Sequence, residues 1–203
     1  MKTKTLILLA VTAVLLSSCY RERRYYLTEA QMQTIPYERG QVISFIFGTG
    51  QAVDLTVTER RRWFRRTGTR EGDNVSVEIK GVVLRSELNC LVIDIELWYG
   101  GMRIEVIDSD RRRTGFLVFM DGEGNFLNSG WNTSGTNSIY FHENLEINNR
   151  HYFDVAEINR MTPTQAEFGV PGTPRIPIQL FYNKTYGILQ INRDGENFLT
   201  INH

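Results

Sequence analysis

Apolar and polar residues alternate one by one over several stretches of this chain. Successive side chains of a β-strand point to opposite faces, so a period of two indicates half-buried antiparallel strands with one apolar and one polar face. The pattern therefore predicts a protein built mainly of such strands. The clearest stretches are residues 53–58, 75–80 and 91–98.

Turn-forming residues separate these runs at the spacing of β-hairpins. Glycine pairs, and Asn or Asp followed by Asn or Gly, adopt the positive φ angles that tight hairpin turns require. Four prolines between Met161 and Pro177 predict the longest irregular connection. Turns are expected at Gly48–Gly50, Gly100–Gly101, Asp121–Gly124, Asn148–Asn149 and Asp194–Gly195.

The sequence contains no amphipathic helical pattern of ten or more residues. One short helix is expected after Leu27, because Thr28 and Gln31 match a capping box and Pro36 follows as a stop signal. We therefore predict an all-β fold: a single antiparallel domain of about ten strands, either a sandwich or a strongly curved sheet. An outer-membrane barrel is disfavoured, because its strands need about 9–11 residues with a lipid-facing apolar row.

The N-terminus has the parts of a secretory signal peptide. Two lysines precede an apolar run from Leu6 to Leu16, which is shorter than the roughly 18 residues of a transmembrane helix. The next residues, Leu16-Ser17-Ser18-Cys19, resemble the lipobox of bacterial lipoproteins. That resemblance implies a cleaved signal peptide at residues 1–18 and a lipid-anchored Cys19. An ordinary signal peptide with an incidental Cys, or an uncleaved anchor, are the alternatives.

The chain that would remain after cleavage of the signal peptide is predicted to have two parts. Residues 19–26 would form a lipidated tether, and residues 27–203 a β-rich globular domain. Cys90 has no intramolecular partner once Cys19 is lipidated. It lies in an apolar, strand-like stretch, so we interpret it as a small buried residue rather than a nucleophile.

Parts of the C-terminal half resemble a known group of proteins. The motifs are residues 149–155, then Leu180 to Ile191 with Tyr182 and Lys184-Thr-Tyr-Gly, then Asp194-Gly195 with Phe198. Together with Ile35-Pro36-Tyr37, they are similar to motifs of uncharacterised lipoproteins from Bacteroidetes-type bacteria. The resemblance implies an outer-membrane lipoprotein with a β-rich domain. In those bacteria acids just after the Cys accompany surface export, and the basic stretch Tyr20–Arg24 here favours the periplasmic face.

Overall charge excludes one class of partner. The chain has 23 Lys and Arg against 23 Asp and Glu, so its formal net charge is zero. A neutral balance argues against nucleic acid as a partner. The membrane through the lipid anchor, and an envelope protein, glycan or lipid, are the expected partners.

Candidate metal ligands are few. If Asn148–Asn149 forms the hairpin turn, His151 lies opposite Glu146 and not opposite His142, so two histidines do not converge on a metal. The loop that starts at Asp121 lacks the Gly and Glu that a calcium-binding loop needs at its sixth and twelfth positions. Asp108 and Asp110 nearby leave calcium as an open alternative. We predict no metal site.

Catalytic and cofactor motifs are not found either. The sequence contains no G-x-S-x-G, H-E-x-x-H or P-loop pattern, and no nucleotide, haem or flavin signature. Asp94 and Glu96 share a strand face, and pairs of carboxylates serve glycosidases, but alternating acids on a strand usually face water. We predict no catalytic residue, no cofactor and no enzymatic activity.

Arginine is the unusual feature of the composition. After residue 18 the chain has 19 Arg against 2 Lys, with a second cluster at Arg111–Arg113. Arginine binds carboxylates, phosphates and sulfates through two parallel hydrogen bonds, and Trp63 or Phe64 could stack on a sugar. The arginines are candidates for a patch that binds an anionic glycan or lipid head group; the alternative, which charge runs more often represent, is solvated surface charge paired with the acids. The patch comprises Arg60, Arg61, Arg62, Trp63, Arg65 and Arg66.

Two functions are compatible with these features. The first is a lipid-anchored envelope protein that acts as a non-enzymatic binding or structural module. The second is a carrier of a lipid or another hydrophobic ligand inside a curved β-sheet. Strands that are apolar on both faces, such as Phe116–Met120, suit a lined cavity and a two-layer core equally well.

Overall fold

The protein is an all-β molecule, and thirteen strands of its described residues join one sheet. The computed structural model describes residues 23–68, 74–87, 90–111, 113–127, 137–162 and 176–202. Twelve strands follow the hydrogen-bonded order β8-β7-β6-β5-β4-β3-β2-β13-β12-β11-β10-β9, and these neighbours are antiparallel. The elements are β1 (Arg23–Tyr25), α2 (Glu29–Gln33), β2 (Val42–Phe47), β3 (Ala52–Gly68), β4 (Asn74–Ser86), β5 (Leu91–Trp98), β6 (Gly101–Asp108), β7 (Arg113–Met120), β8 (Phe126–Leu127), β9 (Asn137–Ile147), β10 (Arg150–Thr162), β11 (Ile176–Asn183), β12 (Gly187–Arg193) and β13 (Glu196–Asn202).

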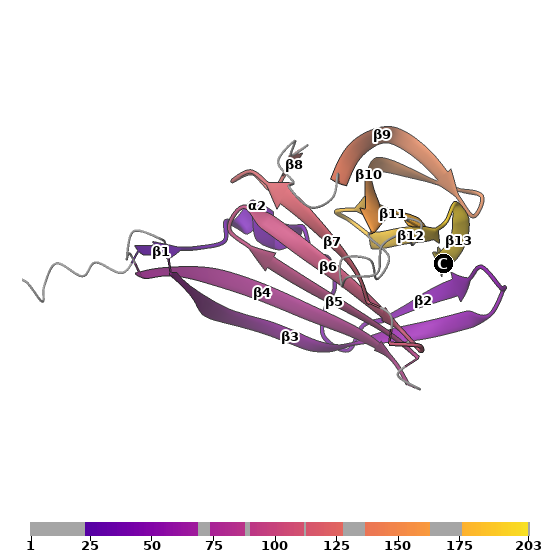
Figure 1. Ribbon diagram of the computed structural model, residues 1–203, viewed down its shortest axis with the longest axis horizontal. Coiled ribbons are helices and arrows are strands. Elements are labelled where there is room, and N and C mark those ends of the chain that lie inside the picture. The colour runs from indigo at the N-terminus through magenta and orange to yellow at the C-terminus, as the bar shows by residue number, and fades with distance from the viewer. Residues whose placement is uncertain are drawn as a thin grey trace, which may run out of the picture.

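The sheet curls until its two ends nearly meet. Figure 1 shows β2–β7 as one broad layer, with β9–β13 folded over it. β7 approaches β9 and β10 without pairing to them, so the seam between the end strands β8 and β9 stays open. The apolar side chains of both layers form one connected core inside the curve. The predicted all-β antiparallel domain is therefore confirmed, and a strongly curved sheet describes it better than a two-sheet sandwich.

One end of the curled sheet is covered by residues 27–38, which we call the plug. It contains the short helix α2, whose predicted capping box between Thr28 and Gln31 is present. Gln31 Nε2 donates to the Asp121 carbonyl at 2.8 Å. The Tyr182 hydroxyl donates to the Thr34 carbonyl at 2.6 Å. The plug thus connects strands from both layers. In the part of the chain that the structure describes, no helix is long and apolar enough to cross a membrane.

Most predicted hairpins form as expected. The turn at Asn148–Asn149 places His151 opposite Glu146, and both turn residues have positive φ angles. Asp194–Gly195 also turns with positive φ. The glycine pair behaves differently: Trp98 pairs with Gly101, so the turn lies at Tyr99–Gly100, one residue earlier than predicted. Trp98 explains the shift, because its ring packs against Gly101, where an added Cβ would lie 2.8 Å from it.

Two features of the N-terminal half differ from what the sequence predicts. In β4 the polar row Ser76, Glu78 and Lys80 is buried, because the plug covers that face. Residues 23–25 of the predicted tether belong to the sheet, since β1 pairs in parallel with β4. The signal peptide at residues 1–18, the lipidation site Cys19 and most of the irregular connection between residues 161 and 177 lie outside the described residues.

Candidate anion-binding cleft

The arginine run lies on the longest strand of the sheet. β2 pairs with β3 only as far as Thr56, and from Glu59 to Gly68 the described partner of β3 is β4 alone. This part of β3 therefore has an open edge. Charged side chains on an open edge discourage pairing with another chain, which is one structural reason for the arginines.

The pleat of β3 divides the six predicted residues between two faces. Residues that pair across neighbouring strands point to the same side of a sheet. Arg60 pairs with the core residue Val82, and Arg62 pairs with the buried Lys80, so both point to the inner face. The six residues therefore form two surfaces and not one patch. Arg60, Arg62 and Arg66 belong to the inner face, and Arg61, Trp63 and Arg65 to the outer face.

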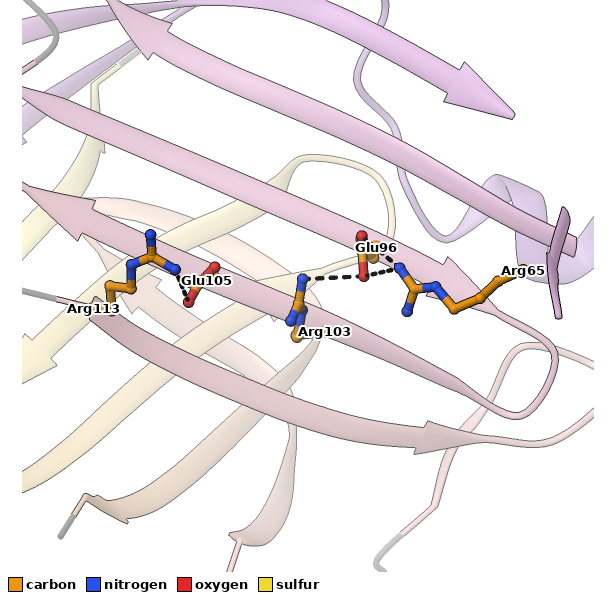
Figure 2. Close-up of polar contacts among 5 residues, drawn as sticks. All are labelled: Arg65, Glu96, Arg103, Glu105 and Arg113. Atoms are coloured by element: carbon orange, nitrogen blue, oxygen red, sulfur yellow. Dashed lines mark hydrogen bonds and ion pairs between the residues drawn. The ribbon is translucent and has the colours of Figure 1, made fainter. Parts of the chain in front are cut away.

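On the outer face, arginines are matched with carboxylates. Figure 2 shows Arg65 and Arg103 binding the two oxygens of Glu96, each at 3.1 Å, and Arg113 approaching Glu105 at 3.8 Å. Arg61 forms an ion pair with Glu59 in the same way. Four strands, β3, β5, β6 and β7, therefore contribute to a surface network in which these charges neutralise one another.

Asp94 belongs to the same outer face, one residue pair further along the sheet. Burial, followed by the negative charges of Glu96 and Glu105, raises the pKa of Asp94, against the lowering effect of Arg103 and Arg61. The Asp94 and Glu96 pair noted in the sequence is thus part of an ionic network on the outside of the sheet.

Trp63 also lies on the outer face and cannot stack on a ligand held by Arg60 or Arg62. A Cβ added to Gly81 would lie 2.8 Å from the Trp63 ring, so the indole rests directly on the glycine. Ile79 pairs with both Trp63 and Trp98 and is 2% exposed. Trp63 therefore covers an apolar site on the outside of the sheet.

The inner-face arginines border a cleft between β3 and the plug. The cleft has a volume of about 580 Å³, which is in the size range of small-molecule sites. Its apolar wall comes from Met32, Ile35 and Pro36 of the plug. Its cationic side comes from Arg60, Arg62 and Lys80; Arg61 borders it at the strand edge, although its guanidinium pairs with Glu59 on the outer face. The acids that line the cleft are Glu29 and Glu38.

Lys80 lies at the base of this cleft and is 6% exposed. Its Nζ donates to the carbonyl of Met32 at 2.5 Å and to that of Ile35 at 3.3 Å. Burial first, and then the positive charges of Arg60 and Arg62, lower the pKa of Lys80 to about 8. Lys80 thus holds the plug on the sheet, and none of the described carboxylates pairs with its charge.

Glu78 is the buried neighbour of Lys80 in the same polar row. Its carboxylate forms an ion pair with Arg62 and accepts the Leu27 N–H at 3.0 Å. Burial alone would raise the pKa of Glu78, but these two hydrogen bonds and the Arg62 charge together hold it below its usual value. Because Glu78 already neutralises Arg62, it does not neutralise Lys80 or Arg60.

The side chain of Arg60 forms no ion pair or hydrogen bond with any residue that the structure describes. The cleft therefore contains two cations without a carboxylate partner, Arg60 and Lys80, one exposed and one buried. An anionic group is the ligand that such a pair would bind, with Arg60 able to grip two of its oxygens.

A second cleft, of about 660 Å³, lies at the open seam of the sheet. We call it the seam cleft. Aromatic side chains line it together with polar and charged residues such as Lys184, and Phe141 and Phe153 are 60% and 63% exposed. Asp154, in the strand beside them, has a φ of 55°, which bends β10 at this point. The aromatic residues of the seam cleft are Phe126, Phe141, Tyr152, Phe153 and Tyr186.

Other candidate residues from the sequence are occupied by local contacts. Cys90 is half-buried against the core, with Sγ 3.2 Å from Ser86 Oγ. His142 Nε2 lies 2.7 Å from Glu157. The Asp121 carboxylate accepts the backbone N–H groups of Glu123 and Asn125, as in an ordinary turn. Among the described residues no group of His, Cys, Asp or Glu is arranged to hold a metal ion.

Comparison with protein-family models, with curated proteins and with solved structures finds no match for this chain. The assignment of the cleft as a candidate binding site is therefore based on the geometry of this protein alone. The sequence reasoning missed Lys80. A signal was present, since Lys80 is one of only two lysines after residue 18 and ends an alternating run. Its burial depends on the plug, which lies more than forty residues away in the chain.

Proposed function

We propose that this protein is a lipid-anchored envelope protein that acts as a non-enzymatic binding module. Its ligand is an anionic group of an envelope component, such as the sulfate, phosphate or carboxylate of a glycan or lipid. The observation that carries the proposal is the pair of cations in the cleft, Arg60 and Lys80, which have no carboxylate partner among the residues that the structure describes.

Two acids on β4 and β5 are held in ion pairs, which makes them poor candidates for catalysis; Glu29 and Glu38, which line the cleft, are not among them. General acid–base catalysis requires a carboxyl group that can exchange protons with a substrate. Glu96 is held by two arginines, and Glu78 is held by Arg62 and a backbone N–H. Both are committed to ion pairs that stabilise the fold.

The anchor is proposed from Leu16–Cys19, and the basic stretch after it favours the periplasmic face of the outer membrane. Acylation with two or three chains gives stable attachment, whereas one chain holds a protein only marginally. Replacement of Cys19 by Ala should move the protein from the membrane fraction to the soluble fraction. Unchanged fractionation would refute the anchor without bearing on the cleft.

Binding in the cleft is tested with heparin as a sulfated probe, by titration calorimetry at low salt. Arg60→Ser should weaken binding about tenfold, the effect of losing one charge-assisted hydrogen-bond partner. Arg113→Ser is the matched control, because it removes an exposed arginine from the outer face. An equal loss of affinity in the two variants would show that heparin responds only to overall charge, and the cleft would be rejected.

A carrier of hydrophobic ligands is the second candidate function. The inside of the curved sheet is filled by buried side chains, so the seam cleft is the place that favours this function. Native mass spectrometry of the purified protein, with solvent extraction, would detect a bound lipid. A stoichiometric lipid that is lost in Phe153→Ser would favour the carrier, and a protein without ligand would favour the anion-binding cleft.

A further inference from the structure

Four exposed aromatic side chains gather where the chain enters the sheet. Tyr25, Tyr26, Phe64 and Tyr99 are 37%, 54%, 44% and 46% exposed. Tyr25 lies 5.2 Å from Tyr99, and Tyr26 lies 5.5 Å from Phe64, measured between ring centroids. In Figure 1, β1 runs beside the ends of β3 and β4 at one extremity of the molecule. Aromatic rings grouped at one extremity form a contact surface, unlike apolar residues scattered singly.

Arginines from the same strand ends surround these rings. Arg23 and Arg24 belong to β1, and Arg65 and Arg66 to β3; the charge of Arg65 is already paired with Glu96 on the outer face. The Arg24 guanidinium lies 5.8 Å from the centre of the Phe64 ring. No acidic residue occurs in the described strand ends 23–26, 64–68 and 74–77. We call these four aromatic residues and four arginines the tip.

The tip is the part of the fold nearest to the proposed anchor. Residues 20–22 separate Cys19 from β1. A fully extended chain spans at most about 3.6 Å per residue, so the Cα of Arg23 lies within about 14 Å of that of Cys19. An acylated Cys19 would therefore bring the tip against the bilayer before any other described part of the protein.

We propose that the tip docks on the phospholipid head groups of the membrane that holds the anchor. This inference rests on the proposed anchor at Cys19 and goes beyond it. Aromatic rings with an apolar body and a polar edge prefer the level of the head groups, and arginines bind lipid phosphates there. The docked tip fixes the orientation of the protein. Because Arg60 is four residues from Phe64 along β3, the cleft lies about 13 Å further from the membrane.

The test uses secreted residues 20–203, which keep every described strand, and vesicles of phosphatidylcholine with or without phosphatidylglycerol. If the tip docks on the membrane, the protein should float together with the anionic vesicles in a density gradient. Added salt should reduce the fraction of protein that floats, because it screens the arginines. The double variant Tyr26→Ser/Phe64→Ser should weaken partitioning at least fivefold. The matched control is Leu127→Ser/Tyr140→Ser, which removes two exposed apolar side chains outside both the tip and the seam cleft and should leave partitioning unchanged within about twofold.

A second variant separates a loss of membrane binding from a loss of folding, because it changes only an exposed, charged side chain. Arg23→Ser changes an exposed side chain of β1 and should weaken flotation about fivefold. Absence of flotation, or equal losses in the tip and control variants, would overturn the proposal. A dimer that is seen in sedimentation equilibrium and is lost in the tip variant would also overturn the proposal, since the tip would then bind a second copy of the chain. Failure of the anchor is judged separately, by fractionation of the full chain with Cys19→Ala.

Discussion

The two faces of β3 hold neighbouring arginines in different surroundings. On the outer face Arg61 and Arg65 have carboxylate partners on the same strand or on β5. On the inner face the carboxylate of Glu78 serves Arg62, and Arg60 has no partner among the described residues. A chain with zero net charge thus concentrates unmatched positive charge on one face. Total charge therefore says little about local binding, because pairing is decided by the partner on the neighbouring strand.

The largest effect should come from the inner face, on replacement of Glu78. Glu78→Ala removes the ion pair with Arg62 and leaves the Leu27 N–H without its acceptor. We expect the free energy of unfolding to fall by about 2 to 3 kcal/mol, measured by urea denaturation, chiefly because the Leu27 N–H stays buried without an acceptor. The outer-face control Glu105→Gln should cost less than about 0.5 kcal/mol, because its partner Arg113 is 3.8 Å away and exposed. Equal losses would mean that the two faces do not differ as described.

The outer face is tested at Gly81, where the indole of Trp63 leaves no space for a methyl group. Gly81→Ala should lower the free energy of unfolding by about 2 kcal/mol, in the range of overpacked sites. In the background Trp63→Ala the same substitution should be nearly neutral, because the ring is gone. A cost that is independent of Trp63 would place the indole elsewhere.

The smallest effect should be a pH dependence that Lys80 creates. The pKa of Lys80 is lowered to about 8 in the folded protein, against an ordinary value of 10.5. Between these values the unfolded chain binds more protons than the folded one, so stability rises with pH. We expect a gain of about 1 kcal/mol from roughly pH 7 to 9, and anion binding that weakens as Lys80 loses its proton above about pH 8. Lys80→Met should abolish both trends, and trends that persist in this variant would assign them to another group.

Local sequence signals predicted the local structure well. The capping box at Thr28 forms, and the turns at Asn148–Asn149 and Asp194–Gly195 have the positive φ angles that these residues tolerate. In β5 the apolar row Leu91 to Leu97 faces the core as the alternation predicts. These features depend on residues within a few positions of one another, so the sequence contains the information directly.

The candidate site was predictable only in part. The arginine run drew attention to β3, and Arg60 and Arg62 do border the cleft. The sequence did not separate these residues from Arg61, Trp63 and Arg65, since that division requires the register with β4. Glu78 and Lys80 were not recognised, because their polar row resembles a row that faces water.

The sequence by itself determined that apolar and polar residues alternate along the strands, and it located most of the hairpin turns to within one residue. The tertiary structure decided which face of each strand is inside, and β4 shows the physical reason. A period of two distinguishes two faces but does not say what covers each of them. In β4 the plug covers the polar face, so Lys80 and Glu78 are buried with partners supplied by residues 27–35, about fifty positions earlier in the chain. Such long-range contacts are made only when the sheet has curled, and they turn an ordinary alternating strand into the base of a cationic cleft.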